Sequence, residues 1–190
     1  MAISRFPVAQ LDDLPEDLHT RISAIQEKAG FIPNVFLALG HRPDELRAFM
    51  DYHDALMLRD GGLSKAEKEM IVVAVSGANN CLYCVVAHGA ILRIYKKDPQ
   101  IADQVAINYR KAAISIRERA MLDFALKVGN DPASISEADF EALSAVGFTQ
   151  DDAWDIGSIA AFFSMSNRLA NMSSMLPNDE FYLMGRQPKS

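Results

Sequence analysis

Apolar and polar residues recur with a helical period along almost the whole chain. Between residues 43 and 59, for example, Leu46, Phe49, Met50 and Leu56 fall at helical spacing with charged residues between them. No segment shows sustained period-two alternation rich in β-branched residues, so a sheet is not expected. Glycine and proline stand mostly where the segments join. The pattern predicts an all-α fold, a compact helical bundle with helices at residues 14–29, 33–40, 43–59, 64–78, 81–96, 98–109, 115–129, 136–146 and 150–174.

Four of these helices begin with a capping-box pattern. In this motif a Ser or Thr caps the first turn and an acidic side chain three residues later bonds back to the cap. The boxes begin at Ser64, Ser115, Ser136 and Thr149. The stretches that begin at Leu63 and Ile114 also resemble each other. Either they mark an internal duplication of a helical hairpin, or they are merely two similar caps.

Residues 64–78 differ from the other predicted helices. The run Met70–Val75 is apolar on every side, which implies burial all round, by the domain itself or by a partner subunit. A run of this length also suits a buried strand. The capping box at Ser64 and the charged stretch Lys65–Glu69 favour a helix, so we expect a central buried helix here.

Composition narrows the class of protein. The chain has 190 residues, of which 49% are hydrophobic and 23% charged, as in a soluble globular protein and unlike a disordered chain. We expect an N-terminal helical extension at 1–30, a helical domain at 31–178 and a C-terminal tail at 179–190. The net charge of −6 without a basic patch argues against nucleic-acid binding. No signal-like segment and no apolar stretch of ~20 residues is present, so we expect a cytoplasmic protein with no membrane partner.

The candidate chemistry lies in the predicted helix at 81–96. Asn79 and Asn80 precede Cys81, and asparagine is a favoured N-cap, so we expect Cys81 in the first turn of that helix. The helix dipole there favours a thiolate. Cys84 lies three residues further on and His88 four beyond that, so the three side chains share one face. The spacing therefore indicates a thiol pair with an imidazole base beside it.

Glu69, on the preceding predicted helix, is the candidate carboxylate to orient His88. Thiol, base and orienting carboxylate together have the form of an activated nucleophile. A thiolate that meets a peroxide becomes a sulfenic acid, and a neighbouring thiol condenses with it to a disulfide. A dithiol partner would then reopen the disulfide by exchange. We therefore predict that Cys81 and Cys84 form a redox-active disulfide, with no cofactor.

Other interpretations of this site stay open. Zinc could bind Cys81, Cys84 and His88, with a fourth ligand required in a structural site. The remaining histidines, any of which could supply it, are His19, His41 and His53. In that case the protein is a structural helical subunit. A third hypothesis is a dithiol–disulfide oxidoreductase of unknown substrate.

Several nearby residues have roles that the pattern alone leaves open. Tyr83 is either a packing residue or an accessory residue that touches the site. Asn167 and Arg168 are polar positions in an apolar helix and either brace the site helices or are exposed. The last long helix also carries aromatic residues that we expect in the core, namely Trp154, Phe162 and Phe163.

The spacing of the reactive residues resembles the core of the alkylhydroperoxidase D family, within the wider carboxymuconolactone decarboxylase-like superfamily. The shared pattern is Glu69, eleven residues, Cys81, two residues, Cys84, three residues and His88. Two later stretches are similar to members of a peroxidase-related branch, and the resemblance extends over roughly residues 40–175. These stretches are Glu118–Lys127 and Ala160–Arg168.

The resemblance implies an all-helical subunit that assembles into trimers or hexamers, with a thiol-dependent, peroxiredoxin-type peroxidase activity and an antioxidant role. It implies a hydroperoxide substrate and a lipoyl or thioredoxin-type reductant. It assigns Glu69 and His88 to a proton relay, Cys84 to peroxide attack and Cys81 to resolution and exchange. The helix-dipole argument instead favours Cys81 as the thiolate. We follow the resemblance for Cys84, and expect Cys81 to be the more exposed thiol.

One position departs from the family pattern. The best-known peroxidase of this family has a second histidine between its cysteines, where this chain has Tyr83. A tyrosine side chain with a pKa near 10 is a poor base at neutral pH. The departure implies weaker activity toward peroxides or a different oxidant.

Overall fold

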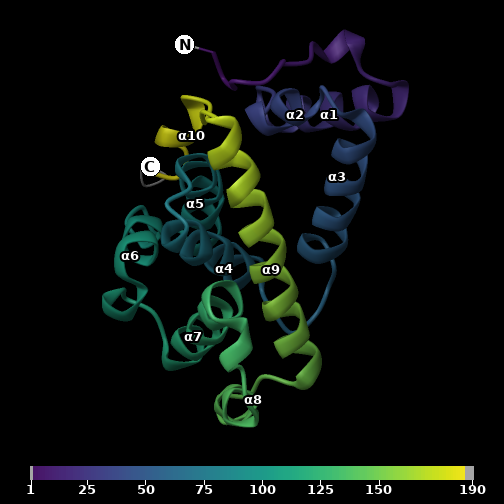
Figure 1. Ribbon diagram of the computed structural model, residues 1–190. Coiled ribbons are helices and arrows are strands. Elements are labelled where there is room, and N and C mark those ends of the chain that lie inside the picture. The colour runs from purple at the N-terminus through teal and green to yellow at the C-terminus, as the bar shows by residue number, and fades with distance from the viewer. Residues whose placement is uncertain (1, 187–190) are drawn as a thin grey trace.

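The computed structural model describes residues 2–186, and within this range the chain is helical and contains no strand (Figure 1). All nine predicted helices are present, most of them shorter by one to three residues at an end. They are α1 (Glu16–Ala29), α2 (Asn34–Leu39), α3 (Pro43–Met57), α4 (Lys65–Ala78), α5 (Leu82–Lys96), α6 (Ile101–Asn108), α7 (Ile116–Asn130), α8 (Glu137–Ser144) and α9 (Gln150–Ser173). The structure adds α10 (Glu180–Leu183) and the short 3₁₀ turns η1 (Leu11–Asp13), η2 (Tyr109–Lys111) and η3 (Pro132–Ser134). The all-α prediction is confirmed.

The predicted capping boxes start four of the helices, α4, α7, α8 and α9. At the start of α4, the Ser64 hydroxyl accepts a hydrogen bond from the backbone N–H of Glu67 at 3.2 Å. The Glu67 carboxylate in turn accepts one from the backbone N–H of Ser64 at 2.8 Å. Two donors that the first turn leaves without partners are thereby satisfied, which sets where the helix begins.

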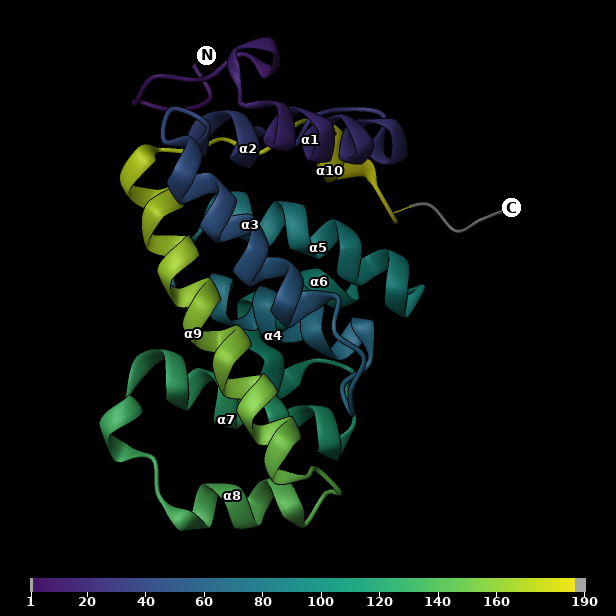
Figure 2. The ribbon, with the colours of Figure 1, turned by 90° about the vertical axis from the view of Figure 1, so that its right-hand side faces the viewer.

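Helix α4 is the centre of the bundle, as its apolar sequence predicts. It packs against α5, α6, α7 and α9 (Figure 2). Every residue from Lys68 to Ser76 is buried. The contact with α6 is close at Gly77, where an added Cβ would overlap the backbone carbonyl of Ala106. The chain itself therefore buries this helix, so the apolar run does not require a partner subunit.

Both ends of the described chain pack at one end of the bundle. Helices α1 and α2 lie across it with α10, whereas α8 lies at the opposite end, and the long α9 connects the two (Figure 2). In α10, Phe181 is buried and packs edge-on against Phe31 at 4.9 Å between ring centroids. Arg93 of α5 donates hydrogen bonds to the carbonyls of Phe181 and Met184. The predicted tail is thus docked on α5 as far as it is described; residues 187–190 lie outside the described range.

The prediction that Trp154 belongs to the core is wrong, because 74% of its surface is exposed. The buried face of α9 carries Ile156, Ile159 and Phe163 at helical spacing. Trp154 precedes Ile156 by two residues, which is about 200° around the helix and so on the opposite face. Phe162 and Phe163 are buried as predicted.

Among residues 2–186, no helix combines the length and the apolar character that crossing a membrane requires.

Candidate active site

The thiol pair lies where α4 turns into α5, but the cap of α5 differs from the prediction. Cys81 is itself the N-cap residue, and its sulfur accepts a hydrogen bond from the backbone N–H of Cys84 at 3.4 Å. Asn80 adopts a left-handed conformation with φ of 51° and makes the turn between the helices. The expectation that an asparagine caps the helix and that Cys81 lies in its first turn is therefore wrong by one residue: the N-cap is Cys81, and the helix begins at Leu82. The sulfur of Cys81 still lies at the positive end of the helix dipole.

The two thiols interact with each other. The Cys84 thiol donates a hydrogen bond toward Cys81 and lowers the pKa of Cys81, although burial opposes this. The same bond, together with burial and the negative charge on Cys81, raises the pKa of Cys84 well above that of an ordinary thiol. Of the two thiols, Cys81 is therefore the one that loses its proton more easily. This agrees with the helix-dipole argument from the sequence.

Neither thiol is accessible to a large partner in this structure. Only 1% of Cys81 and 2% of Cys84 is exposed, so the expectation that Cys81 is the more exposed thiol is wrong. The physical reason is that α2 and the segment after α9 form a cover over the start of α5, while α10 packs against α5 further along, at Arg93. The apolar cluster around the sulfurs includes Phe31, Met175 and Phe181.

Two asparagines fasten this cover. The side chain of Asn178 accepts a hydrogen bond from the backbone N–H of Asn34 and donates one to the carbonyl of Ile32. The side chain of Asn34 donates in return to the carbonyl of Leu176. Sequence reasoning missed these residues, since more than 140 positions separate them and no local motif marks either one.

His88 and Glu69 meet as the sequence predicts. The Nδ1 atom of His88 lies 2.8 Å from Oε2 of Glu69, and both side chains are largely buried. The imidazole packs edge-on against Phe163, with 4.8 Å between ring centroids. Because Nδ1 is held by the carboxylate, Nε2 is the ring atom left for proton transfer. The positive charge of His88 contributes to lowering the pKa of Cys81.

Asn167 of α9 braces the site from the other side. It is fully buried, donates a hydrogen bond to the hydroxyl of Ser76 at 2.9 Å and accepts one from the side chain of Asn79 at 3.1 Å. Its amide also lowers the pKa of both thiols by hydrogen bonding. Arg168, by contrast, is exposed and donates only to a carbonyl of its own helix.

Tyr83 is buried and acts in packing. Its hydroxyl accepts a hydrogen bond from the backbone N–H of Val35 in α2 at 3.2 Å. Burial raises the pKa of Tyr83 above its ordinary value. A phenol in this state does not serve as a base at neutral pH.

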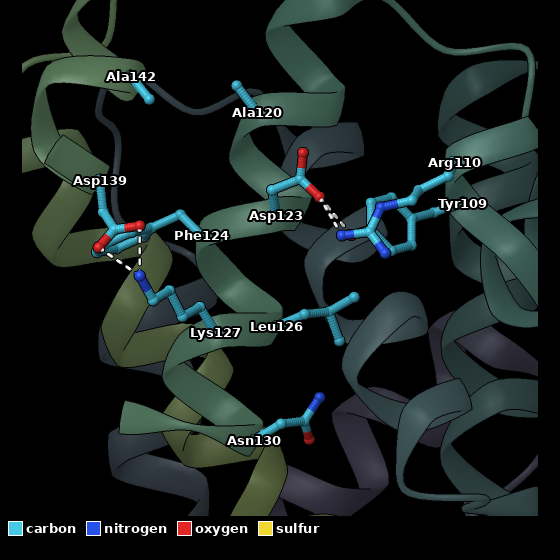
Figure 3. Close-up of a pocket in the computed structure, with 10 residues that line it drawn as sticks. All are labelled: Tyr109, Arg110, Ala120, Asp123, Phe124, Leu126, Lys127, Asn130, Asp139 and Ala142. Atoms are coloured by element: carbon cyan, nitrogen blue, oxygen red, sulfur yellow. Dashed lines mark hydrogen bonds and ion pairs between the residues drawn. The ribbon is translucent and has the colours of Figure 1, made fainter. Parts of the chain in front are cut away.

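A hollow of about 600 Å³ lies away from the thiols, between α7, α8 and η2 (Figure 3). It contains neither cysteine nor histidine, and its charged groups pair with each other. Lys127 contacts Asp139 at 2.7 Å, and Arg110 contacts Asp123 at 2.9 Å (Figure 3). The hollow therefore has no visible link to the thiol chemistry.

The zinc interpretation finds no support in the geometry. Nowhere in residues 2–186 do three or more His, Cys, Asp or Glu side chains come together in an arrangement that could hold a metal ion. Cys81, Cys84 and His88 thus do not form the ligand set that a structural zinc site needs.

Comparison with known proteins identifies the family. The family model named "Carboxymuconolactone decarboxylase family" matches residues 43–127. A crystal structure described as an alkylhydroperoxidase AhpD core, an uncharacterized peroxidase-related protein from Ralstonia eutropha JMP134, is 67% identical, with all of both chains covered and a TM-score of 0.98. The chain belongs to the AhpD-like family. A peroxidase-related protein from Silicibacter sp. TM1040 is 42% identical over 98% of this chain and 100% of that one, with a TM-score of 0.90.

A more distant solved structure shares the fold alone. The debrominase Bmp8 is 21% identical over 97% of this chain and 96% of its own, with a TM-score of 0.76. A comparison with curated protein sequences finds no match. The all-helical architecture that the sequence resemblance implied is therefore confirmed, and the family with it.

Proposed function

We propose that this AhpD-like protein is a thiol-dependent peroxidase that reduces hydroperoxides through a Cys81–Cys84 redox pair. The observation that carries the proposal is the Glu69–His88 pair beside two coupled thiols. The Nδ1 atom of His88 lies 2.8 Å from Oε2 of Glu69, so a carboxylate-oriented imidazole stands beside a thiol pair in which the pKa of Cys81 is lowered. A structural thiol pair needs no such partner, since buried structural cysteines are unreactive.

The reaction starts from the reduced pair with its charge on Cys81. The Cys84 thiol passes its proton to the Cys81 sulfur, and the Cys84 thiolate attacks the terminal peroxide oxygen. The O–O bond breaks, Cys84 becomes a sulfenic acid, and the alkoxide that leaves takes a proton from His88. This scheme follows the family resemblance in assigning the attack to Cys84, with Cys81 as its base.

The second half of the cycle forms and reopens the disulfide. The Cys81 sulfur attacks the Cys84 sulfenic acid, the S–S bond forms as the S–O bond breaks, and the hydroxyl leaves as water with the proton of the Cys81 thiol. A lipoyl or thioredoxin-type dithiol then reduces the disulfide by exchange. The cover formed by α2 and the segment after α9 has to open for a protein reductant to reach the sulfurs, because both sulfurs are buried. We place this cycle in the cytoplasm, where the pair is kept reduced.

The proposal is tested by counting thiols around one turnover. The reduced protein is expected to show two titratable thiols on denaturation and none after one equivalent of cumene hydroperoxide, with a mass loss of two hydrogen atoms. Dihydrolipoamide and reduced thioredoxin are then compared as donors for sustained turnover. If the hydroperoxide leaves both thiols intact while a disulfide substrate oxidises them, the protein is a dithiol–disulfide oxidoreductase instead.

We also propose that the protein works as a homo-oligomer, a trimer or hexamer. Apolar side chains remain exposed on several helices in the single chain, as an interface would require. They include Leu58, Ile107, Ile116 and Trp154. Light scattering is expected to give at least three times the 21.0 kDa of one chain. A monomeric mass at micromolar concentration would contradict this proposal.

A further inference from the structure

A second histidine lies beside the site, on a helix that the sequence does not connect with it. His53 of α3 packs against Phe163 with 6.3 Å between ring centroids, and against Phe162 with 6.2 Å. The imidazole of His88 packs on the same Phe163 ring. These centroid distances fall within the range of aromatic contacts, so one phenyl ring contacts both imidazoles.

His53 is held by a carboxylate in the same way as His88. Its Nδ1 atom lies 3.0 Å from Oδ1 of Asp54, just as Nδ1 of His88 lies 2.8 Å from Glu69. Arg21 of α1 in turn donates a hydrogen bond to Asp54 at 3.0 Å. With Nδ1–H donated to the carboxylate, the Nε2 atom of His53 is free to accept a proton.

The charges around His53 couple it to the site. Burial is the main cause that lowers the pKa of His53, and the positive charge of His88 lowers it further. Asp54 on the same helix and Glu69 on α4 act in the opposite direction. His53 is therefore neutral at pH 7 and responds electrostatically to both members of the Glu69–His88 pair.

The two imidazoles differ in how much of their side chains is exposed to solvent. The side chain of His53 is 31% exposed, compared with 15% for His88, so His53 is the imidazole closer to solvent. Tyr83, which lies between the two cysteines in the sequence, is buried and cannot exchange protons at neutral pH.

We propose that His53, oriented by Asp54, exchanges protons between solvent and the Glu69–His88 pair during peroxide reduction. The inference rests on the proposed peroxidase function and deepens it. When the leaving alkoxide takes the proton from His88, the neutral His88 recovers one through His53 from solvent. His53 acts through His88 and does not touch the peroxide, so it is a positioning residue.

The first test does not depend on activity. Ring-nitrogen NMR titrations of the histidines are recorded for the wild type and for His88→Gln. Removal of the His88 cation is expected to raise the titration midpoint of His53, because a neighbouring positive charge is lost. The midpoint of His19, on α1, serves as an internal control and should not move. An unchanged His53 midpoint would overturn the coupling.

The second test asks whether that coupling serves the chemistry. Steady-state turnover with excess dithiothreitol as the reductant is measured in His53→Gln, in Asp54→Asn and in the control His19→Gln, because His88 has to regain its proton in every cycle. With tert-butyl hydroperoxide, whose alkoxide needs a proton, His53→Gln is expected to slow turnover at least about tenfold. With peracetic acid, whose leaving carboxylate needs none, the rate should stay close to that of the wild type.

The outcomes separate this inference from the proposed function. An equal loss with both oxidants, or no loss with either, would overturn the relay role of His53. If the wild-type dithiol resists both oxidants, the peroxidase proposal fails and the relay role fails with it, whereas a shifted His53 midpoint would still show that the two histidines are coupled. If His53→Gln does not fold, Asp54→Asn keeps the imidazole and is expected to show the same dependence on the oxidant.

Discussion

Replacing Cys84 with serine is expected to abolish hydroperoxide turnover, with a loss of more than about 10³-fold, as for other enzymes that lose their nucleophile. The reason is that a serine cannot form the sulfenic acid or the disulfide on which the cycle depends. Serine is close to cysteine in size, and the helix that carries it is held by contacts far from the sulfur. The melting temperature and circular dichroism of Cys84→Ser should therefore remain near those of the wild type.

A single-turnover experiment then shows which sulfur attacks. Cys81→Ser keeps the proposed nucleophile but loses the base, so slow formation of a dimedone-trapped sulfenic acid is expected on Cys84. Cys84→Ser should yield none on Cys81. If Cys84→Ser instead forms a Cys81 sulfenic acid at the wild-type rate, the attack belongs to Cys81, the thiol whose pKa is lowered. Retained steady-state turnover in Cys84→Ser would remove the redox pair from the mechanism altogether.

The second large effect is expected at the ion pair. His88→Ala removes the proton donor to the leaving alkoxide, and Glu69→Gln removes the charge that stabilises the protonated imidazole. Each should lower the rate of hydroperoxide reduction by about 10²–10⁴-fold, the range for general acid–base groups. The thiol count of the reduced protein should not change, because neither residue is a redox group.

The pH dependence gives a check on the same pair. The wild-type rate should fall as acid protonates the Cys81 thiolate, and this limb should lie below the range of an ordinary thiol because the pKa of Cys81 is lowered. The positive charge of His88 contributes to that lowering, so the limb in His88→Ala should move to higher pH.

Glu141→Gln, on the exposed face of α8, is the matched control for Glu69→Gln. Wild-type rates in His88→Ala would refute the relay.

The contact between Glu69 and His88 could be predicted from the chain because both residues lie on consecutive helices joined by a tight turn. Spacing along α5 places His88 one turn beyond Cys84, and burial of Glu69 among apolar residues requires a partner. The predicted N-cap of α5 was wrong by one residue. Asparagine and cysteine compete for that position, and the left-handed turn at Asn80 settles the choice.

Local sequence determined the helices of this protein, their starting points and the spacing of its thiols and imidazole, because capping and helical periodicity act between residues at most a turn or two apart. Tertiary structure alone decided that Trp154 faces outward, that Asn34 and Asn178 fasten a cover over the sulfurs, and that His53 stands beside His88. Each of these depends on which faces of distant helices meet. Packing of the whole bundle sets those contacts, and no short-range preference encodes them.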